Sequence, residues 1–458
     1  MYSERRVRNM FSELREKYKT FIFDDYSIKN EDECIKIKYS FIIEGLSNFT
    51  TEWIIKTSSK IEDIKEIEEM VFSLGMVELI SYWKLTCSPI VKINVNYLNK
   101  EQIDWWKKLY YNGLGEFFYI NNIQTDMDNF MKIEVKNNKE VKYIASQRNL
   151  KGSLIPIGGG KDSIVTLDLL KDDVINNNCY IINERDITVN TAIIAGFEKE
   201  NIITANRKLD KKIIELNKQN FLNGHTPFSA IVAFSAVLVA YLKGNKYVVL
   251  SNEASANEST VLNEDINHQY SKSYEFEKDF NLYIEKYLKI NIEYFSILRP
   301  LSEFQITKYF SKLNQYHYIF RSCGLGSKTS DWSWCCSCPK CLFVFIMLSA
   351  FLDMTYLTEI FGINLLEKKE LLNTMNKLVG IEKDKPFECV GSRDEINTAI
   401  CIAINKLKNN KQDIPFLYNE YLKSNLVKPD LTKYDKYYDK ENNLPEYFDK
   451  IVRRKFNI

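Results

Sequence analysis

A short apolar run that ends in three glycines constrains the fold of this chain more than any other feature. Residues 153–157 are apolar, and a helical pattern begins at Ser163, directly after the glycine turn. Glycine permits positive φ and close approach of the backbone to an anion, while a helix start offers free N–H groups and partial positive charge. The pattern therefore predicts a strand, a phosphate-binding turn and a helix. The residues expected to bind phosphate are Gly158, Gly159, Gly160, Lys161, Asp162 and Ser163.

Short strand candidates alternate with helical stretches between residues 150 and 300. The strand candidates are 153–157, 179–183, 201–205, 247–252 and 292–298, and the clearest helix is 228–242. Such alternation is typical of βαβ units and predicts an α/β fold with a doubly wound parallel sheet. Ligands of such sheets bind beyond the carboxyl ends of the strands.

Three regions of the chain differ in pattern and predict domain boundaries. Residues 1–148 mix strand-like runs with short helices and predict an N-terminal α+β domain, whereas residues 149–300 predict the nucleotide-binding domain. Residues 301–458 predict a helical region with a cysteine cluster and a solvated C-terminal appendage. Because the phosphate-binding elements all follow residue 150, we expect the N-terminal domain to recognise the acceptor substrate, with aromatic residues around 110–119 as candidates.

The charge balance argues against a polybasic nucleic-acid-binding protein. Lys and Arg number 62 and Asp and Glu 61, so the net charge is close to zero. The N-terminus lacks the apolar core of a secretory signal, and the longest apolar stretches are shorter than the ~20 residues of a membrane span. We expect a cytoplasmic protein with reduced cysteines and neither a membrane nor a nucleic-acid partner.

The glycine turn differs from two common phosphate-binding motifs. A Walker A loop has Ser or Thr after its lysine, where this chain has Asp162, and the Rossmann fingerprint spaces its glycines differently. The turn resembles the PP-loop of the ATP pyrophosphatase superfamily, S-G-G-x-D-S, with Gly158 in place of the first serine. The resemblance implies a PP-loop α/β fold that holds pyrophosphate, cleaves ATP between its α- and β-phosphates and adenylates a substrate oxygen. The alternative is a glycine turn without a ligand.

Polar side chains follow three of the predicted strands. Glu253 follows 247–252 and can hold Mg²⁺ or orient substrate, with helix capping as the structural alternative. Asn183 follows the second strand, where adenine or ribose is expected. Arg299 follows the fifth strand, resembles a basic position common in PP-loop enzymes, and is expected to face phosphate.

Four cysteines in the C-terminal region have the spacing C-x11-C-x2-C-x2-C and predict a metal site. They are Cys323, Cys335, Cys338 and Cys341, and Cys336 can replace Cys335. Four thiolates close a tetrahedral Zn²⁺ shell, which is typical of structural sites. The spacing resembles the zinc site of PP-loop enzymes that make 7-cyano-7-deazaguanine. The alternatives are an iron–sulfur cluster and free thiols.

Proton-transfer candidates are few, because the chain has only three histidines. His268 lies in a polar stretch, and His225 lies at a predicted helix start, whereas His317 has apolar neighbours and is expected in the core. Glu388 and Cys389 lie in a second candidate loop, 386–391. Together with Glu253 and His268, they form the set of candidate catalytic bases.

Several motifs together resemble one enzyme family. IPIGGGKDS (155–163), NGHTPFSA (223–230), SNEASANE (251–258), NHQYSKSYEFE (267–277), RPLSE (299–303) and PFECVGS (386–392), with YYNGLGEFFYIN (110–121) and the cysteine segment 320–345, are similar to the UDP-N-acetylmuramoyl-L-alanyl-L-glutamate epimerase family, MurL. The resemblance implies ATP- and Mg²⁺-dependent epimerisation of the terminal L-glutamate of UDP-MurNAc-L-Ala-L-Glu through an acyl-adenylate, which supplies D-glutamate for peptidoglycan.

Two other function classes remain open at this point. One is a PP-loop enzyme that amidates or thiolates a nucleobase or tRNA, although the absence of net positive charge weakens the RNA version. The other is a non-catalytic protein that senses ATP.

Overall fold

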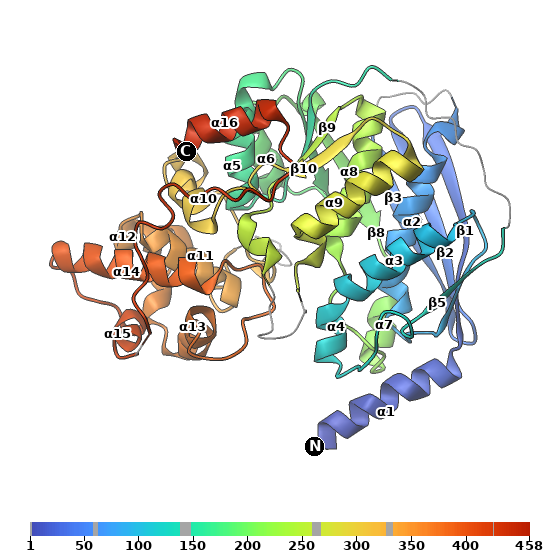
Figure 1. Ribbon diagram of the computed structural model, residues 1–458, viewed down its shortest axis with the longest axis horizontal. Coiled ribbons are helices and arrows are strands. Elements are labelled where there is room, and N and C mark those ends of the chain that lie inside the picture. Colours follow the sequence, from blue (N-terminus) through green and yellow to red (C-terminus); the bar gives the residue numbers. More distant parts are fainter. Residues whose placement is uncertain (1, 58–62, 138–147, 259–266, 327–332, 425) are drawn as a thin grey trace.

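The computed structural model describes residues 2–57, 63–137, 148–258, 267–326, 333–424 and 426–458 (Figure 1). Ten strands form one continuous mixed sheet in the order β10-β9-β6-β7-β8-β3-β2-β1-β4-β5. The strands are β1 (Thr20–Glu31), β2 (Cys34–Ile43), β3 (Ser47–Lys56), β4 (Ile90–Ile93), β5 (Lys132–Val135), β6 (Ser153–Pro156), β7 (Asn178–Ile182), β8 (Ile202–Lys208), β9 (Tyr247–Leu250) and β10 (Glu293–Ser296). The predicted α/β class is confirmed, with a sheet that is larger than expected and not parallel throughout.

Helices cover the sheet and build the C-terminal region (Figure 1). They are α1 (Tyr2–Lys17), α2 (Glu68–Trp83), α3 (Lys100–Gly113), α4 (Gly115–Ile120), α5 (Lys161–Leu170), α6 (Asp186–Ile194), α7 (Lys212–Lys218), α8 (Phe228–Lys243), α9 (Tyr274–Tyr283), α10 (Glu303–Phe310), α11 (Pro339–Ser349), α12 (Met354–Phe361), α13 (Leu372–Val379), α14 (Arg393–Asn409), α15 (Phe416–Leu422) and α16 (Glu446–Phe456). No described helix is both long and apolar enough to cross a membrane.

The five strands β10, β9, β6, β7 and β8 are parallel neighbours. All five lie where the sequence predicts strands, and helices connect them, as parallel pairing requires. From β6 the chain continues through β7 and β8 on one side, whereas β9 and β10 lie on the other side. The strand order therefore reverses between β6 and β9, which is where ligands of open α/β sheets bind.

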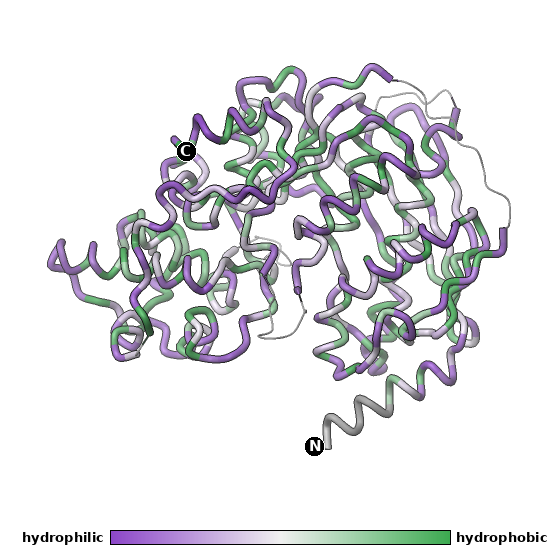
Figure 2. Tube along the Cα trace, viewed as in Figure 1, coloured by the Kyte–Doolittle hydropathy of each residue, from purple (hydrophilic) through white to green (hydrophobic). Residues whose placement is uncertain are grey.

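Alternate side chains of these strands enter two different cores. Leu154 and Val248 pack in a core with α2, α3, α8 and α9, whereas Ile155 and Val249 pack in a second core with α5, α10, α11 and α14. This follows from the two-residue period of a strand. Figure 2 shows the hydrophobic residues gathered along the strands and inner helices.

The N-terminal strands extend the same sheet. β1, β2 and β3 are antiparallel, β4 and β5 continue in parallel beyond β1, and β3 pairs antiparallel with β8 from Glu52↔Lys208 to Ile55↔Ala205. Along β2 the buried side chains alternate with more exposed ones, so one face of these strands packs on the core. Short hairpins join β1 to β2 and β2 to β3, which is why these three strands are antiparallel.

The end of the chain returns to the sheet, in contrast to the predicted solvated appendage. Phe448 of α16 is buried, with its ring 5.1 Å from that of Tyr247 and 4.8 Å from that of Phe295. The backbone N–H of Asp439 also donates to Pro300 O at 2.8 Å. The polar composition of the last fifty residues obscured the apolar stripe of one amphipathic helix.

Candidate active site

The glycine turn joins β6 to α5 at the reversal of strand order. Gly159 has φ +77°, and Gly160 is the extended residue before the first turn of α5. A Cβ on Gly160 would lie 3.0 Å from Ser322 Oγ, whereas a Cβ on Gly158 would meet no atom within 4 Å. The turn is therefore closed on its Gly160 side and open at Gly158, as an anion site at a helix N-terminus requires.

A pocket of about 460 Å³ opens beside this turn. Its apolar wall comes from Tyr180 and Ile182 at the end of β7 and from Val232 of α8. Other parts of the wall come from segments far apart in sequence, namely Gly158, Gly160, Asp162, Ser163, Ser251–Glu253, Lys272, 321–324, Lys340 and Cys389. The strand ends and the C-terminal region thus share one pocket, which offers a ligand both apolar and charged surfaces.

Three carboxylates meet beside the pocket, and the two that line it, Asp162 and Glu253, were predicted site residues. Asp162, Glu253 and Glu303 each place one oxygen within 4.8 Å of the others. Glu303 is 2% exposed, and its Oε2 has no hydrogen-bond partner among the described residues. Burial raises the pKa of Glu303 to about 8, and Asp162 and Glu253 add to the rise. Such a set of oxygens fits a hard cation such as Mg²⁺.

Lys161 does not line the pocket as a point charge, although the sequence predicts it to bind phosphate. Its side chain is fully buried and ion-paired with Asp162 and with Glu303 Oε1, the latter at 2.6 Å. Burial disfavours the ammonium, yet both carboxylates raise its pKa, so Lys161 stays charged. Lys161 is therefore placed to neutralise the two carboxylates and not to contact a ligand in the pocket.

Cys389 faces the pocket from the loop before α14. Lys272 Nζ donates to its Sγ at 2.9 Å, and Lys340 donates to its backbone carbonyl. Burial raises the pKa of the thiol, but Lys272, His268 and Lys340 outweigh this effect and lower it to about 6. Cys389 is therefore a thiolate near neutral pH. His268 hydrogen-bonds to Cys389 but does not line the pocket. Glu388 does not line it either.

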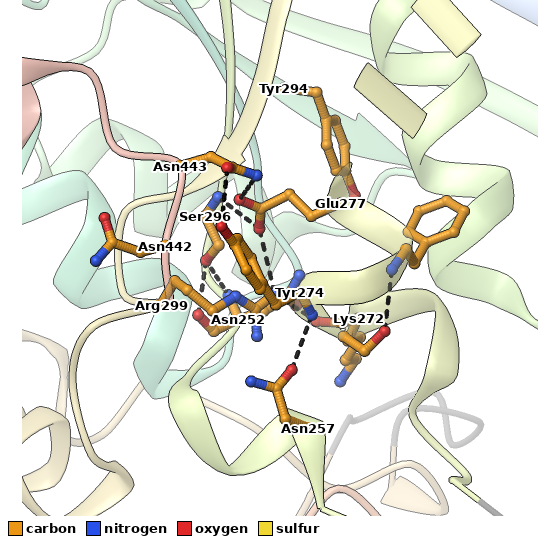
Figure 3. A network of polar contacts seen from close by, with 12 residues as sticks. Asn252, Asn257, Lys272, Tyr274, Glu277, Tyr294, Ser296, Arg299, Asn442 and Asn443 are labelled. Atoms are coloured by element: carbon orange, nitrogen blue, oxygen red, sulfur yellow. Dashed lines mark hydrogen bonds and ion pairs between the residues drawn. The ribbon is translucent and has the colours of Figure 1, made fainter. Parts of the chain in front are cut away.

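Arg299 and Asn183 lie elsewhere than the phosphate and nucleotide positions expected of them. Figure 3 shows the buried Arg299 beside Glu277 and Lys272; its guanidinium donates to Glu253 O at 2.9 Å, to Lys272 O and to Glu277 Oε2. It thus ties together two segments that line the pocket. Asn183, at φ +54°, accepts a hydrogen bond from the backbone N–H of Arg207. It is not among the described residues that line the pocket.

The four predicted cysteines form one cluster. Sγ–Sγ distances are 3.8 Å for Cys323–Cys338, 3.7 Å for Cys335–Cys341 and 3.5 Å for Cys338–Cys341. Zn–S bonds of about 2.3 Å in a tetrahedron give S···S edges of about 3.8 Å, so the spacing fits zinc. Cys336 instead directs its Sγ to Phe361 O at 3.4 Å, which leaves Cys335 in the cluster.

Sequence reasoning missed four charged residues of this region, although each lies in or beside a quoted motif. Glu303 ends RPLSE, Lys272 lies in NHQYSKSYEFE, Lys340 lies between two cluster cysteines, and Glu116 lies in the glycine-aromatic segment of the N-terminal half. For Glu116 and Glu303 the signal was a charged residue next to aromatic residues, whereas Lys272 lies among polar neighbours and gave no such signal. Such residues are seldom buried without a partner.

Two models of one protein family together match most of the chain. A family model described as the MurL N-terminal domain matches residues 12–297, and one described as the MurL C-terminal domain matches residues 319–426. The chain belongs to the MurL family. The MurL N-terminal match spans all ten strands, the glycine turn and His268, whereas the C-terminal match holds the cysteine cluster and Cys389.

Curated MurL relatives are named UDP-N-acetyl-alpha-D-muramoyl-L-alanyl-L-glutamate epimerase. The protein of Xanthomonas oryzae pv. oryzae is 32% identical over 74% of this chain and 75% of its own length. That of Salinispora tropica is 32% identical over 73% of this chain and 74% of its own. A third, from Micromonospora sp., is 34% identical over 54% and 56%.

Proposed function

We propose that this protein is an ATP- and Mg²⁺-dependent epimerase that inverts the terminal L-glutamate of UDP-MurNAc-L-Ala-L-Glu through an acyl-adenylate, releasing AMP and pyrophosphate, in peptidoglycan synthesis. The observation that carries the proposal is a single pocket with two chemically distinct walls. The glycine turn with Asp162 and Glu253 forms one wall, next to the buried Glu303, and the Cys389 thiolate with its cations forms the other. The names of the MurL relatives support the substrate.

The first wall suits activation of the glutamate carboxylate. The open backbone at Gly158 and the start of α5 are proposed to hold the departing pyrophosphate, with Ser163 beside them. Asp162, Glu253 and Glu303 would hold Mg²⁺, which, when bound, neutralises charge that develops on the phosphates. Tyr180 and Ile182 offer the adenine an apolar surface.

The second wall suits proton transfer at the α-carbon. A carbanion next to a free carboxylate is strongly disfavoured, and adenylation removes that charge. We propose Cys389 as the base on one face of the α-carbon. Of the other candidate bases, His268 acts through its hydrogen bond to Cys389, and Glu253 belongs to the set of three carboxylates. Burial raises the pKa of Glu388, so this group is protonated more readily than an ordinary glutamate.

The cysteine cluster is proposed to hold a structural Zn²⁺, because a closed shell of four thiolates leaves no open position for substrate.

The acceptor is proposed to reach the pocket past the N-terminal half. Tyr119 of α4 is partly exposed, and its ring lies 5.4 Å from that of Phe387, which is close in sequence to Cys389. Trp105 and Tyr111 instead pack in the interior, where each donates to a backbone carbonyl.

The test is incubation with ATP, Mg²⁺ and UDP-MurNAc-L-Ala-L-Glu, followed by resolution of the glutamate enantiomers and of the nucleotide products. We expect D-glutamyl product and AMP with pyrophosphate, formed only when the acceptor is present. ADP with phosphate would overturn the adenylation step, and L-glutamyl product alone would overturn the epimerase assignment. Lys161→Met and Asp162→Asn should abolish pyrophosphate release.

A further inference from the structure

Glu116, His268 and Cys389 form a line of three polar side chains that ends at the pocket. They come from α4, from the segment before α9 and from the loop before α14, so three distant parts of the chain build the line. Glu116 Oε2 pairs with His268 Nδ1, and His268 hydrogen-bonds to Cys389. A reactive group, an imidazole and an orienting carboxylate in this order are the arrangement that activates a nucleophile or a base.

We propose that Glu116 is a positioning residue: through His268 it keeps Cys389 ionised and able to accept a proton. In the step, the thiolate forms an S–H bond as the Cα–H bond breaks, and the electron pair of that bond passes into the activated acyl group. The identity of the substrate rests on the proposed function. The ionisation of Cys389 does not, so the two can fail separately.

The charged neighbours of His268 and Cys389 agree with this role. Burial alone would lower the pKa of His268, but its hydrogen bonds to Cys389 and Glu116 raise it to about 9. Cys389 is faced by His268, by Lys272 Nζ at 2.9 Å and by Lys340. The carboxylate thus stabilises the imidazolium, and the imidazolium stabilises the thiolate.

A second imidazole shares the same carboxylate. His225 Nδ1 lies 3.4 Å from Glu116 Oε2, and the rings of His225 and His268 are 4.6 Å apart. Burial and the neighbouring His268 lower the pKa of His225 to about 4. Lys84 fixes the His225 loop by donating to Gly224 O and Thr226 Oγ1, and burial lowers its pKa to about 8. Glu116 therefore supports one imidazolium, at His268, while His225 stays neutral.

The unaltered protein allows a direct test, because it has only three histidines. Imidazole NMR signals, followed from pH 4 to 10 and assigned with His225→Gln and His317→Gln, should show His268 titrating near pH 9. Burial lowers the pKa of His317 as well, so the other two histidines should titrate below their ordinary range. Titration of His268 at or below its ordinary value of 6.5 would overturn the proposal.

Glu116→Gln tests the link to the thiol. We expect the midpoint of Cys389 alkylation by iodoacetamide, followed by peptide mass mapping, to move from about pH 6 upward by about one unit or more. Epimerisation should fall by roughly 10²-fold, and ATP–pyrophosphate exchange should fall far less. Glu116→Asp, which keeps the charge, should recover part of both the midpoint and the rate.

Two matched controls separate this effect from general damage. Cys34, whose pKa is raised by burial and by Glu31, should keep its alkylation profile in the same Glu116→Gln sample. Glu101→Gln removes a surface carboxylate that pairs with Lys286 and should leave the Cys389 midpoint in place. An unchanged midpoint in folded Glu116→Gln would overturn the inference. Absence of D-glutamyl product from unaltered protein with a normal midpoint would instead overturn the proposed function.

Discussion

Replacing Glu303 with glutamine should make the metal-free protein more stable while it abolishes activity. The Glu303 side chain is 2% exposed and lies with Asp162 and Glu253, and it is ion-paired with the buried ammonium of Lys161. Glutamine has nearly the same shape and no charge. The substitution therefore removes a repulsion that Lys161 and Lys340 relieve only in part and that a bound cation would relieve further.

The magnitude follows from proton linkage. Burial raises the pKa of Glu303 to about 8 although Lys161 opposes the rise, whereas the ordinary value is 4.5. Between these two pH values the unfolded chain has lost a proton that the folded protein keeps, so stability falls as pH rises. Each pH unit is worth about 1.4 kcal/mol, so at pH 7 the unaltered protein has lost about 3 kcal/mol that the glutamine variant retains.

The assay compares denaturant unfolding of the two proteins in EDTA between pH 4.5 and 8. The stability difference should be near zero at pH 4.5 and should grow with pH in favour of Glu303→Gln. Added Mg²⁺ should stabilise the unaltered protein at pH 8 by mass action and should have little effect on the variant, which has lost a ligand.

Glu277→Gln is the matched control. Glu277 is as buried as Glu303, but its carboxylate accepts from Ser296 N and Asn443 Nδ2 and pairs with Arg299 (Figure 3). Burial raises the pKa of Glu277 too, but Arg299, Asn443 and Ser296 N oppose the rise. Its substitution leaves a buried guanidinium without its counterion and should destabilise the protein. If Glu303→Gln were less stable than the unaltered protein at pH 7, or if the difference did not vary with pH, the reasoning about this carboxylate set would be refuted.

Three further outcomes are expected. Elemental analysis should find about one zinc per chain. Cys338→Ser should lose this metal and unfold at lower temperature, whereas Cys336→Ser should keep it. Tyr119→Ala should raise KM for the UDP-linked acceptor several-fold without changing KM for ATP, and equal changes in both would contradict its role in acceptor binding. In D₂O the D-glutamyl product should carry deuterium at Cα by mass spectrometry, and Cys389→Ser should still exchange pyrophosphate while forming little D-product.

The parallel half of the sheet and its turn could be predicted because their signals are local. Five short apolar runs, each ended by polar or glycine residues, gave the strands around β6, and four cysteines within nineteen positions gave the cluster. The pairing of β3 with β8 had no such signal. It joins residues about 150 positions apart, and nothing in either strand specifies its edge partner.

The partners of the site residues could not be predicted either, because they too are far apart in the sequence. Lys161 and Arg299 carry charges that the sequence directs toward phosphate, but a cation next to a glycine turn can equally neutralise buried carboxylates. Only the fold shows that Glu303 and Glu277 lie within reach of them. Likewise, the pairing of His268 with Glu116 spans 152 positions.

The structure also gives the cysteine cluster a reason to lie beside the chemistry. Lys340 lies between Cys338 and Cys341 at the start of α11, and its ammonium holds the carbonyl of Cys389. Cys323, itself a member of the cluster, and Gly324 also line the pocket. A metal that fixes these four cysteines would therefore fix the backbone of Cys389 and the Ser322 contact that closes the glycine turn at Gly160. Under the zinc proposal, loss of the metal should disturb the glycine turn and Cys389 together, because Ser322 and Lys340 each adjoin a cysteine of the cluster.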